Sequence, residues 1–316
     1  MIGKYIKVFD THAEYQEYSQ GNNMEKPNVS VCKNEHEVHY NPWTWAEEYL
    51  TFVALEDGTF QLSTNAVSYS LDNGETWTEL DAATASPTVT AGNKIMWKST
   101  LMPTSSDGVG TFSATGNFDV QGNPMSLLYG DDFKGQTDLT GKNNAFRKLF
   151  YYNTKVINAE KLSLPATTLT TYCYANMFSG CTGLATVPEL PATILTSSCY
   201  QSMFYGCTSL TTAPELPVTT LANGCYESMF RGCTSLTTAP ELPATTLVSM
   251  CYSNMFNGCT SLNYIKAMFT TTPSNSYTNN WVSGVTSTGT FVKNSAATWD
   301  ETGVNGIPTG WTVVTE

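Results

Sequence analysis

The sequence predicts a mixed α/β, multidomain protein. It has a small N-terminal unit, a β-sandwich-like domain, and a C-terminal solenoid with a β cap. Three observations carry this prediction: a motif repeated four times at a period of 26 residues, a preceding region of short alternating β segments, and a separate N-terminal stretch. The expected boundaries are an N-terminal unit at 1–45, a β domain at 46–130, an N-terminal cap at 131–163, the repeats at 164–266 and a C-terminal cap at 267–316.

The first 45 residues alternate in short segments and contain all three histidines together with one cysteine: His12, Cys32, His36 and His39. Their spacing does not match a zinc site, and a nucleophilic thiol would need a defined partner. We therefore interpret these residues as structural and expect no metal site. We interpret the unit as a docking segment.

Residues 46–130 contain short β-type segments separated by Asp-Gly, Asn-Gly and Gly-Asn turns, which is typical of a small β-sandwich. Ser70–Trp77 matches the Asp-box pattern S-x-D-x-G-x-x-W, familiar from sialidase propellers. In that turn Asp72 bonds backbone amides, Gly74 takes a positive φ and Trp77 packs beneath. A propeller would need several copies, and the chain has too few arginines for sialidase chemistry. We expect a structural turn.

The repeats open at Leu164, Leu190, Leu216 and Leu242. One coil of such a repeat cannot bury its own apolar face, whereas a stack can. In the third copy Leu221, Cys225 and Met229 are four residues apart, which predicts a helix. A short strand should follow each helix and pair in parallel with its copies. The expected strands are Leu184–Val187, Leu210–Ala213, Leu236–Ala239 and Leu262–Ile265.

The repeat core MF-x-GC-x-x-L, carried by Met177-Phe178, Gly180-Cys181 and Leu184, resembles the leucine-rich repeat class and, within it, the BspA-like bacterial repeats. The resemblance implies a leucine-rich-repeat solenoid in which the second cysteine of each copy lines the turn after the helix. Eight cysteines recur in two rows, and we expect buried, reduced thiols, with stacked disulfides as the less favoured alternative. These cysteines are Cys173, Cys181, Cys199, Cys207, Cys225, Cys233, Cys251 and Cys259.

Composition excludes several classes of function. The net charge of −12 and the absence of a basic patch argue against binding to nucleic acid or an anionic membrane. No apolar run is long enough to span a bilayer, and the first residues lack the apolar segment of a secretory signal. We therefore expect no membrane insertion and no export signal.

Two faces of the repeats are candidate binding surfaces. The strand face offers Thr211, Thr212, Thr237, Thr238 and Tyr264, and the helix face offers Tyr205 and Arg231. Glu189, Glu215 and Glu241 recur once per copy, so they form a spaced column that faces solvent unless a cation joins them. No catalytic set and no cofactor site can be isolated. Trp281, Trp299 and Trp311 are expected to cover the last coil, although they could instead stack on a sugar.

The order of segments is similar to that of structural proteins in phages and prophages of gut Bacteroidales. This resemblance implies a non-enzymatic virion component, such as a fibre, a decoration or a receptor-binding protein, assembled in the bacterial cytoplasm. Residues 1–45 would dock to other virion proteins, and the repeats would contact a host-surface protein or glycan, in a chain that could form a homo-oligomer. The alternative is a BspA-like adhesin at the bacterial cell surface, and an enzyme comes third.

Overall fold

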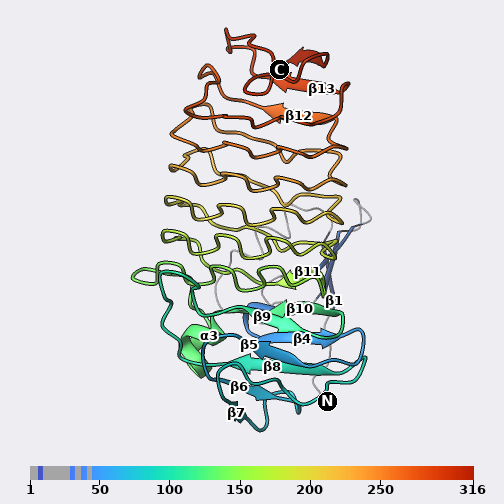
Figure 1. Ribbon diagram of the computed structural model, residues 1–316, viewed down its shortest axis with the longest axis vertical. Helices are drawn as coiled ribbons and strands as arrows, with labels where there is room; N and C mark the ends of the chain where they lie inside the picture. The colour runs from blue at the N-terminus through green and yellow to red at the C-terminus, as the bar shows by residue number, and fades with distance from the viewer. Residues whose placement is uncertain (1–5, 10–28, 33–36, 41–44) are drawn as a thin grey trace.

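The protein is elongated, with a β-rich region at one end and turns of chain stacked above it to the other (Figure 1). This computed structural model describes residues 6–9, 29–32, 37–40 and 45–316. The described part is mostly β and irregular, and the one α-helix whose bounds it gives is α3 (Ser126–Tyr129), followed by the 3-10 helix η1 (Gly130–Phe133). The expected mixed α/β class with a leucine-rich-repeat solenoid is therefore wrong.

A six-stranded sheet organises the β region, in the order β11-β10-β4-β8-β6-β7. All its pairs are antiparallel except β10 with β11, which are parallel. A separate antiparallel pair, β5 with β9, completes the region, so two comparable sheets of a sandwich are not present there. The strands are β4 (Leu50–Ala54), β5 (Phe60–Leu62), β6 (Val67–Ser70), β7 (Thr78–Leu80), β8 (Lys94–Lys98), β9 (Phe112–Ala114), β10 (Phe118–Gly122) and β11 (Val156–Leu162).

Three N-terminal strands form a sheet of their own in the order β1-β2-β3. They are β1 (Ile6–Phe9), β2 (Val29–Cys32) and β3 (Glu37–Tyr40), with β1 parallel and β3 antiparallel to β2. His12 and His36 lie outside the described residues, and for Cys32 and His39 only the backbone is described. The interpretation of these four residues as structural therefore stays a prediction.

Turns of chain take the place of the expected helices in each repeat. Between Tyr172 and Gly180 alternate amides bond in two directions: those of Ala175 and Met177 donate to carbonyls three residues back, and those of Tyr174 and Phe178 donate to the next repeat. An α-helix would direct all of these amides to carbonyls four residues back within the same segment. The repeats are thus joined by backbone hydrogen bonds along their whole turn face.

A residue with positive φ at every fourth position explains why no helix forms. In the first repeat these residues are Tyr172, Asn176 and Gly180, with φ of 57°, 57° and 78°. Left-handed backbone cannot continue a right-handed helix, and glycine and asparagine adopt it at the least cost. The same spacing recurs in the next three copies, and also before them at Asn144, Lys148 and Tyr152. The stacked pattern therefore begins upstream of Leu164.

The expected strands are also mostly absent. Among the four segments only the last gives a strand, β12 (Tyr264–Ala267), while the others contribute isolated parallel bridges such as Thr212 with Thr238. Prolines explain the short pairing, because Pro214 and Pro240 have no N–H to donate to a ladder.

A parallel sheet of β12, β13 (Thr290–Lys293) and β14 (Thr312–Thr315) lies at the C-terminal end of the stack. The three tryptophans of this region are all buried. Trp281 packs 6.1 Å from the ring of Phe256, the last phenylalanine of the repeats, and Trp299 stacks 5.1 Å from Phe269. Burial removes these rings from the candidates for sugar stacking.

Candidate functional site

The Asp-box turn is built around the carboxylate of Asp72. Its Oδ1 accepts hydrogen bonds from the amide of Thr76 at 2.9 Å and from the hydroxyl of Ser70 at 2.7 Å. Gly74 has a φ of 88°, and the indole of Trp77 donates back to its carbonyl oxygen at 3.1 Å. The polar groups of Ser70, Asp72, Thr76 and Trp77 thus bond to one another or to the backbone within the turn, so the geometry supports a structural role.

These hydrogen bonds stabilise the ionised carboxylate and lower the pKa of Asp72 to about 2, with the bonds from Thr76 as the largest cause. Because this pKa is lower in the folded state than in the unfolded chain, the stabilisation is complete above about pH 4. It is lost as the pH falls toward 2. We expect Asp72→Asn to lower the free energy of unfolding at pH 7 and to lower it by a smaller amount at pH 2.5, where part of the stabilisation is already lost. Urea unfolding followed by tryptophan fluorescence measures both values.

Glu75 in the same turn gives the matched control, because its carboxylate makes no hydrogen bond to a described residue. Glu75→Gln should leave the free energy of unfolding nearly unchanged at both pH values. An NMR titration that placed the pKa of Asp72 near that of a free aspartate would contradict the role given to the Thr76 bonds.

The two rows of cysteines are buried, and no described cysteine forms a disulfide. In the second row each thiol donates a hydrogen bond to a phenylalanine carbonyl of the preceding turn, for example Cys207 to Phe178 at 3.2 Å and Cys233 to Phe204 at 3.0 Å. Burial raises the pKa of Cys259 in this row to about 12, so the thiolate is scarce at neutral pH. The geometry therefore makes these thiols structural donors and not nucleophiles.

Aromatic columns run beside the thiols through the centre of the stack. Tyr200 and Tyr226 stack at 6.0 Å with an interplanar angle of 4°, and Phe204 and Phe230 stack at 5.8 Å. The interior of the described repeats is thus occupied by stacked aromatic rings and buried thiols. Any ligand of the repeats must bind on the outside.

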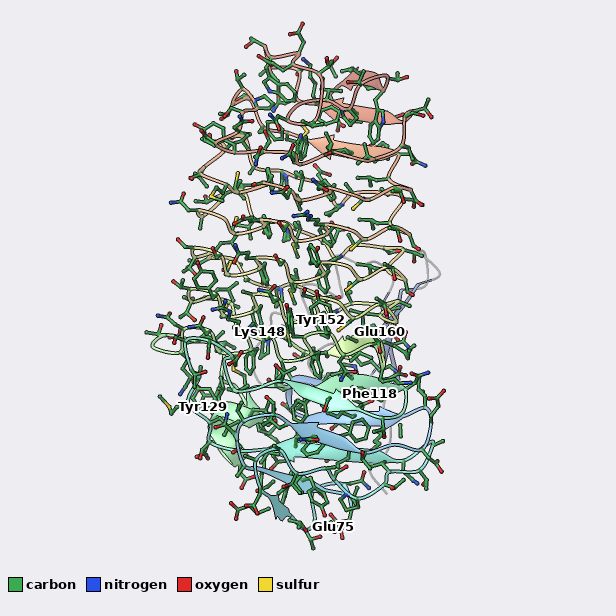
Figure 2. All side chains as sticks on the ribbon, in the orientation of Figure 1. Glu75, Phe118, Tyr129, Lys148, Tyr152 and Glu160 are labelled. Carbon is green, nitrogen blue, oxygen red and sulfur yellow. The ribbon has the colours of Figure 1, made fainter. Side chains whose placement is uncertain are left out.

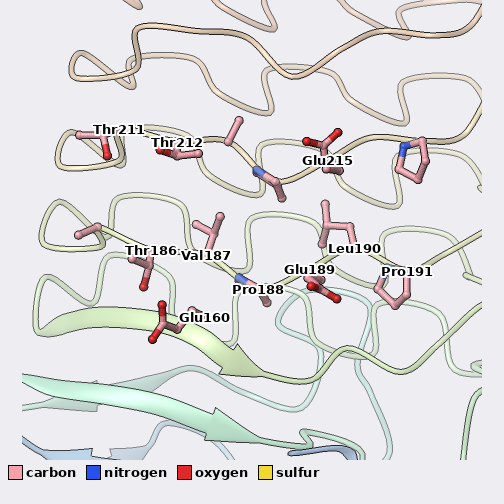
Figure 3. A pocket seen from close by; sticks show the side chains of 14 residues that line it. Glu160, Thr186, Val187, Pro188, Glu189, Leu190, Pro191, Thr211, Thr212 and Glu215 are labelled. Atoms are coloured by element: carbon pink, nitrogen blue, oxygen red, sulfur yellow. The ribbon is translucent and has the colours of Figure 1, made fainter. Parts of the chain in front are cut away.

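An open groove of about 470 Å³ lies on the face that carries the predicted threonines (Figure 3). Thr211 and Thr212 line it, whereas Thr237, Thr238 and Tyr264 belong to later turns and are not part of its lining. Its apolar lining comprises the buried Pro188, Leu190 and Pro214 and the more accessible Val187, Pro191 and Pro217. Glu160, Glu189 and Glu215 supply its charge.

The column of glutamates continues above the groove and ends at a lysine. Lys266 stands at the position that proline occupies in the earlier copies. Its ammonium lies 3.4 Å from a carboxylate oxygen of Glu241 and 3.0 Å from one of Glu316. The Lys266 ammonium therefore joins Glu241 to Glu316, which lies outside the column. No cation among the described residues joins Glu189 or Glu215.

Tyr205 and Arg231 lie together on the turn face, with the guanidinium 5.7 Å from the ring centroid. Two further exposed tyrosines were not foreseen: Tyr151 and Tyr152, whose rings meet edge to face at 4.5 Å. Figure 2 shows Tyr152 near Lys148 at the base of the stack. Tyr152 occupies the same place in its turn as Gly180 does in the next, and this alignment is the signal that could have found it.

Comparisons with known proteins return no match to a family model, to a curated protein or to a solved structure. Within the described residues no cluster of three or more histidine, cysteine, aspartate or glutamate side chains could hold a metal ion. No helix of the described part is both long and apolar enough to cross a bilayer.

Proposed function

We propose that this chain is a non-enzymatic structural component of a phage particle, which docks through residues 1–45 and projects its stacked repeats toward a host-surface protein or glycan. The observation that carries the proposal is the filled core of the stack. Columns of aromatic rings and thiols occupy its interior. The groove and the exposed Tyr151 and Tyr152 lie on its surface. Such an arrangement suits display and contact better than catalysis.

The shape of the chain supports the division into an anchored and a displayed end. The stack rises away from the β region along the long axis of the molecule (Figure 1). Among the described residues, the N-terminal strands pair only with one another. Strand β11 joins the β region to the stack, because it pairs in parallel with β10 and also forms the parallel bridge between Asn158 and Thr186. Removing residues 1–45 therefore breaks no strand pairing of the described β region or stack. The order of segments, which resembles that of phage structural proteins, supports the virion as the location.

A particle-incorporation assay tests the proposal. We expect the chain lacking residues 1–45 to fold, with the same near-UV circular dichroism from its buried aromatic rings, but to be absent from purified particles. The full-length chain with Glu189→Gln and Glu215→Gln should be incorporated at the normal level, because these exposed side chains lie far along the sequence from the docking segment. Quantitative mass spectrometry of particles measures both.

Two outcomes would contradict the proposal. Normal incorporation of the shortened chain would place the docking surface elsewhere. If particles never contain the full-length protein and it is found instead on bacterial cells, the cell-surface adhesin takes the place of the virion component.

A further inference from the structure

The groove on the threonine face is unusual in the sign of its charge. All three charged residues that line it, Glu160, Glu189 and Glu215, are exposed acids. None of their carboxylates accepts a hydrogen bond or an ion pair from the part of the chain that the structure describes. Like charges at this spacing repel one another, so the groove favours a cationic occupant.

The same column of glutamates indicates which kind of cation fits. At its C-terminal end the Lys266 ammonium bridges Glu241 and Glu316, two carboxylates from different turns. Successive turns of chain paired in parallel lie about 5 Å apart. Glu189 and Glu215, one repeat apart, thus offer a similar pair of carboxylates without a lysine between them. Pro214 and Pro240 stand where Lys266 stands in the last copy.

The apolar lining of the groove indicates that its ligand has an apolar part as well as a positive charge. Val187 and Pro191 place accessible apolar surface beside the carboxylates (Figure 3). Pro217, which is the equivalent of Pro191 in the next repeat, is also exposed and adds to this surface. A lysine side chain matches both features, because its methylene stem packs on apolar surface while its ammonium stays at the polar rim. A hydrated metal ion uses oxygen ligands alone and gains nothing from proline rings. Arginine prefers the paired oxygens of one carboxylate, whereas here two separate carboxylates face the groove.

We infer that this groove binds a lysine side chain from an extended segment of a partner polypeptide, with the stem on the exposed Pro191 and Pro217 and the ammonium between Glu189 and Glu215. The hydroxyls of Thr186, Thr211 and Thr212 along the rim can pair with the backbone of that segment. The inference rests on the proposed function only in supposing that the partner lies on the host surface. Binding itself is a property of the isolated chain.

Fluorescence polarisation with a short labelled peptide of alternating lysine and threonine, blocked at both ends, tests the inference on the full chain. We expect binding that weakens as ionic strength rises, since the ion pairs lie near the surface. Glu189→Gln combined with Glu215→Gln should weaken binding roughly tenfold, the effect of losing two partly exposed pairs. Glu241→Gln is the matched control, because Lys266 already occupies that carboxylate, and it should change the affinity by less than about twofold.

A second peptide, with norleucine in place of lysine, keeps the apolar stem and removes the charge, so it should fail to bind. Equal binding of the norleucine peptide, or unchanged affinity of the double variant, would overturn the inference. Full displacement of the lysine peptide by millimolar Ca²⁺ at constant ionic strength would instead make the groove a metal site and also overturn it. The peptide-binding experiment does not involve incorporation into particles. A negative result would therefore overturn the inference about the groove and leave the proposed function untouched.

Discussion

Replacing Cys207 with aspartate should destabilise the protein by several kcal/mol. The Cys207 side chain is fully buried, and its thiol donates to the carbonyl oxygen of Phe178 at 3.2 Å. Aspartate would put an unpaired carboxylate in a packed core and set it against that carbonyl oxygen, which repels it. Chemical denaturation followed by circular dichroism measures the change in the free energy of unfolding.

Two substitutions at the same position separate charge from packing. Cys207→Ser keeps a donor for the Phe178 carbonyl and nearly the same volume, so it should cost far less than aspartate. Cys207→Ala loses the donor and leaves a small cavity, and its cost should fall between the two. If aspartate is tolerated as well as serine, the position is not part of a closed core. Disulfides among the repeat cysteines of the unreduced protein, found by mass spectrometry, would contradict the donor role.

The period of the repeats was read correctly from the sequence, but the local conformation was not. Leu221, Cys225, Met229 and Cys233 are separated by four residues each time. In an α-helix each such step turns about 40° beyond a full circle, so a long stripe at a constant spacing of four drifts off one face. A true helical stripe mixes spacings of three and four. The constant four is the period of a repeated turn.

The residue types at the left-handed positions also indicate repeated turns in place of a helix. Asn176 and Gly180 in the first copy, and Asn254 and Gly258 in the fourth, have positive φ. These two residue types adopt that conformation most readily, and their recurrence four residues apart argues against an uninterrupted helix. A glycine alone is compatible with the end of a helix, whereas a second left-handed residue four positions before it is not.

A candidate site can be predicted from the sequence when its residues lie in one short segment, but not when they come from several turns of chain. The Asp-box could be derived because all of its partners lie within Ser70–Trp77. The groove could not be derived in this way, because its lining comes from three successive turns of chain and its shape depends on how closely they stack. The glutamate column was visible in the sequence, whereas the neutralisation of Glu241 by Lys266 required coordinates.

A single core joins the β region to the stack, although the sequence suggested separate units. Phe52 lies at the centre of the β region, with ring centroids 4.8 Å from Phe118, 4.9 Å from Phe112 and 5.7 Å from Phe150. Phe150 in turn stacks 5.2 Å from Phe178, the first phenylalanine of the repeats. These ring contacts are continuous, so loss of packing in the β region should also lower the stability of the stack.

We therefore expect Phe52→Ala to cost about 3–5 kcal/mol, the usual range for truncating a buried phenylalanine. Leu55→Ala is the control: Leu55 directly follows β4 and its side chain is 44% exposed, so its loss should cost less than about 0.5 kcal/mol.

The decisive measurement compares two probes of the same unfolding transition. In a background where Trp281, Trp299 and Trp311 of the stack are replaced by phenylalanine, tryptophan fluorescence reports on the β region through Trp97, which lies 5.5 Å from Phe52. Reaction of the repeat thiols with a thiol reagent, in a Cys32→Ser background, reports on the stack, because these thiols are buried until it opens. Phe150 packs against both Phe52 in the β region and Phe178 in the stack. The midpoints of the fluorescence and the thiol-exposure transitions should therefore shift together in Phe52→Ala. A shift of the fluorescence midpoint with no change in thiol exposure would show instead that the β region and the stack unfold independently.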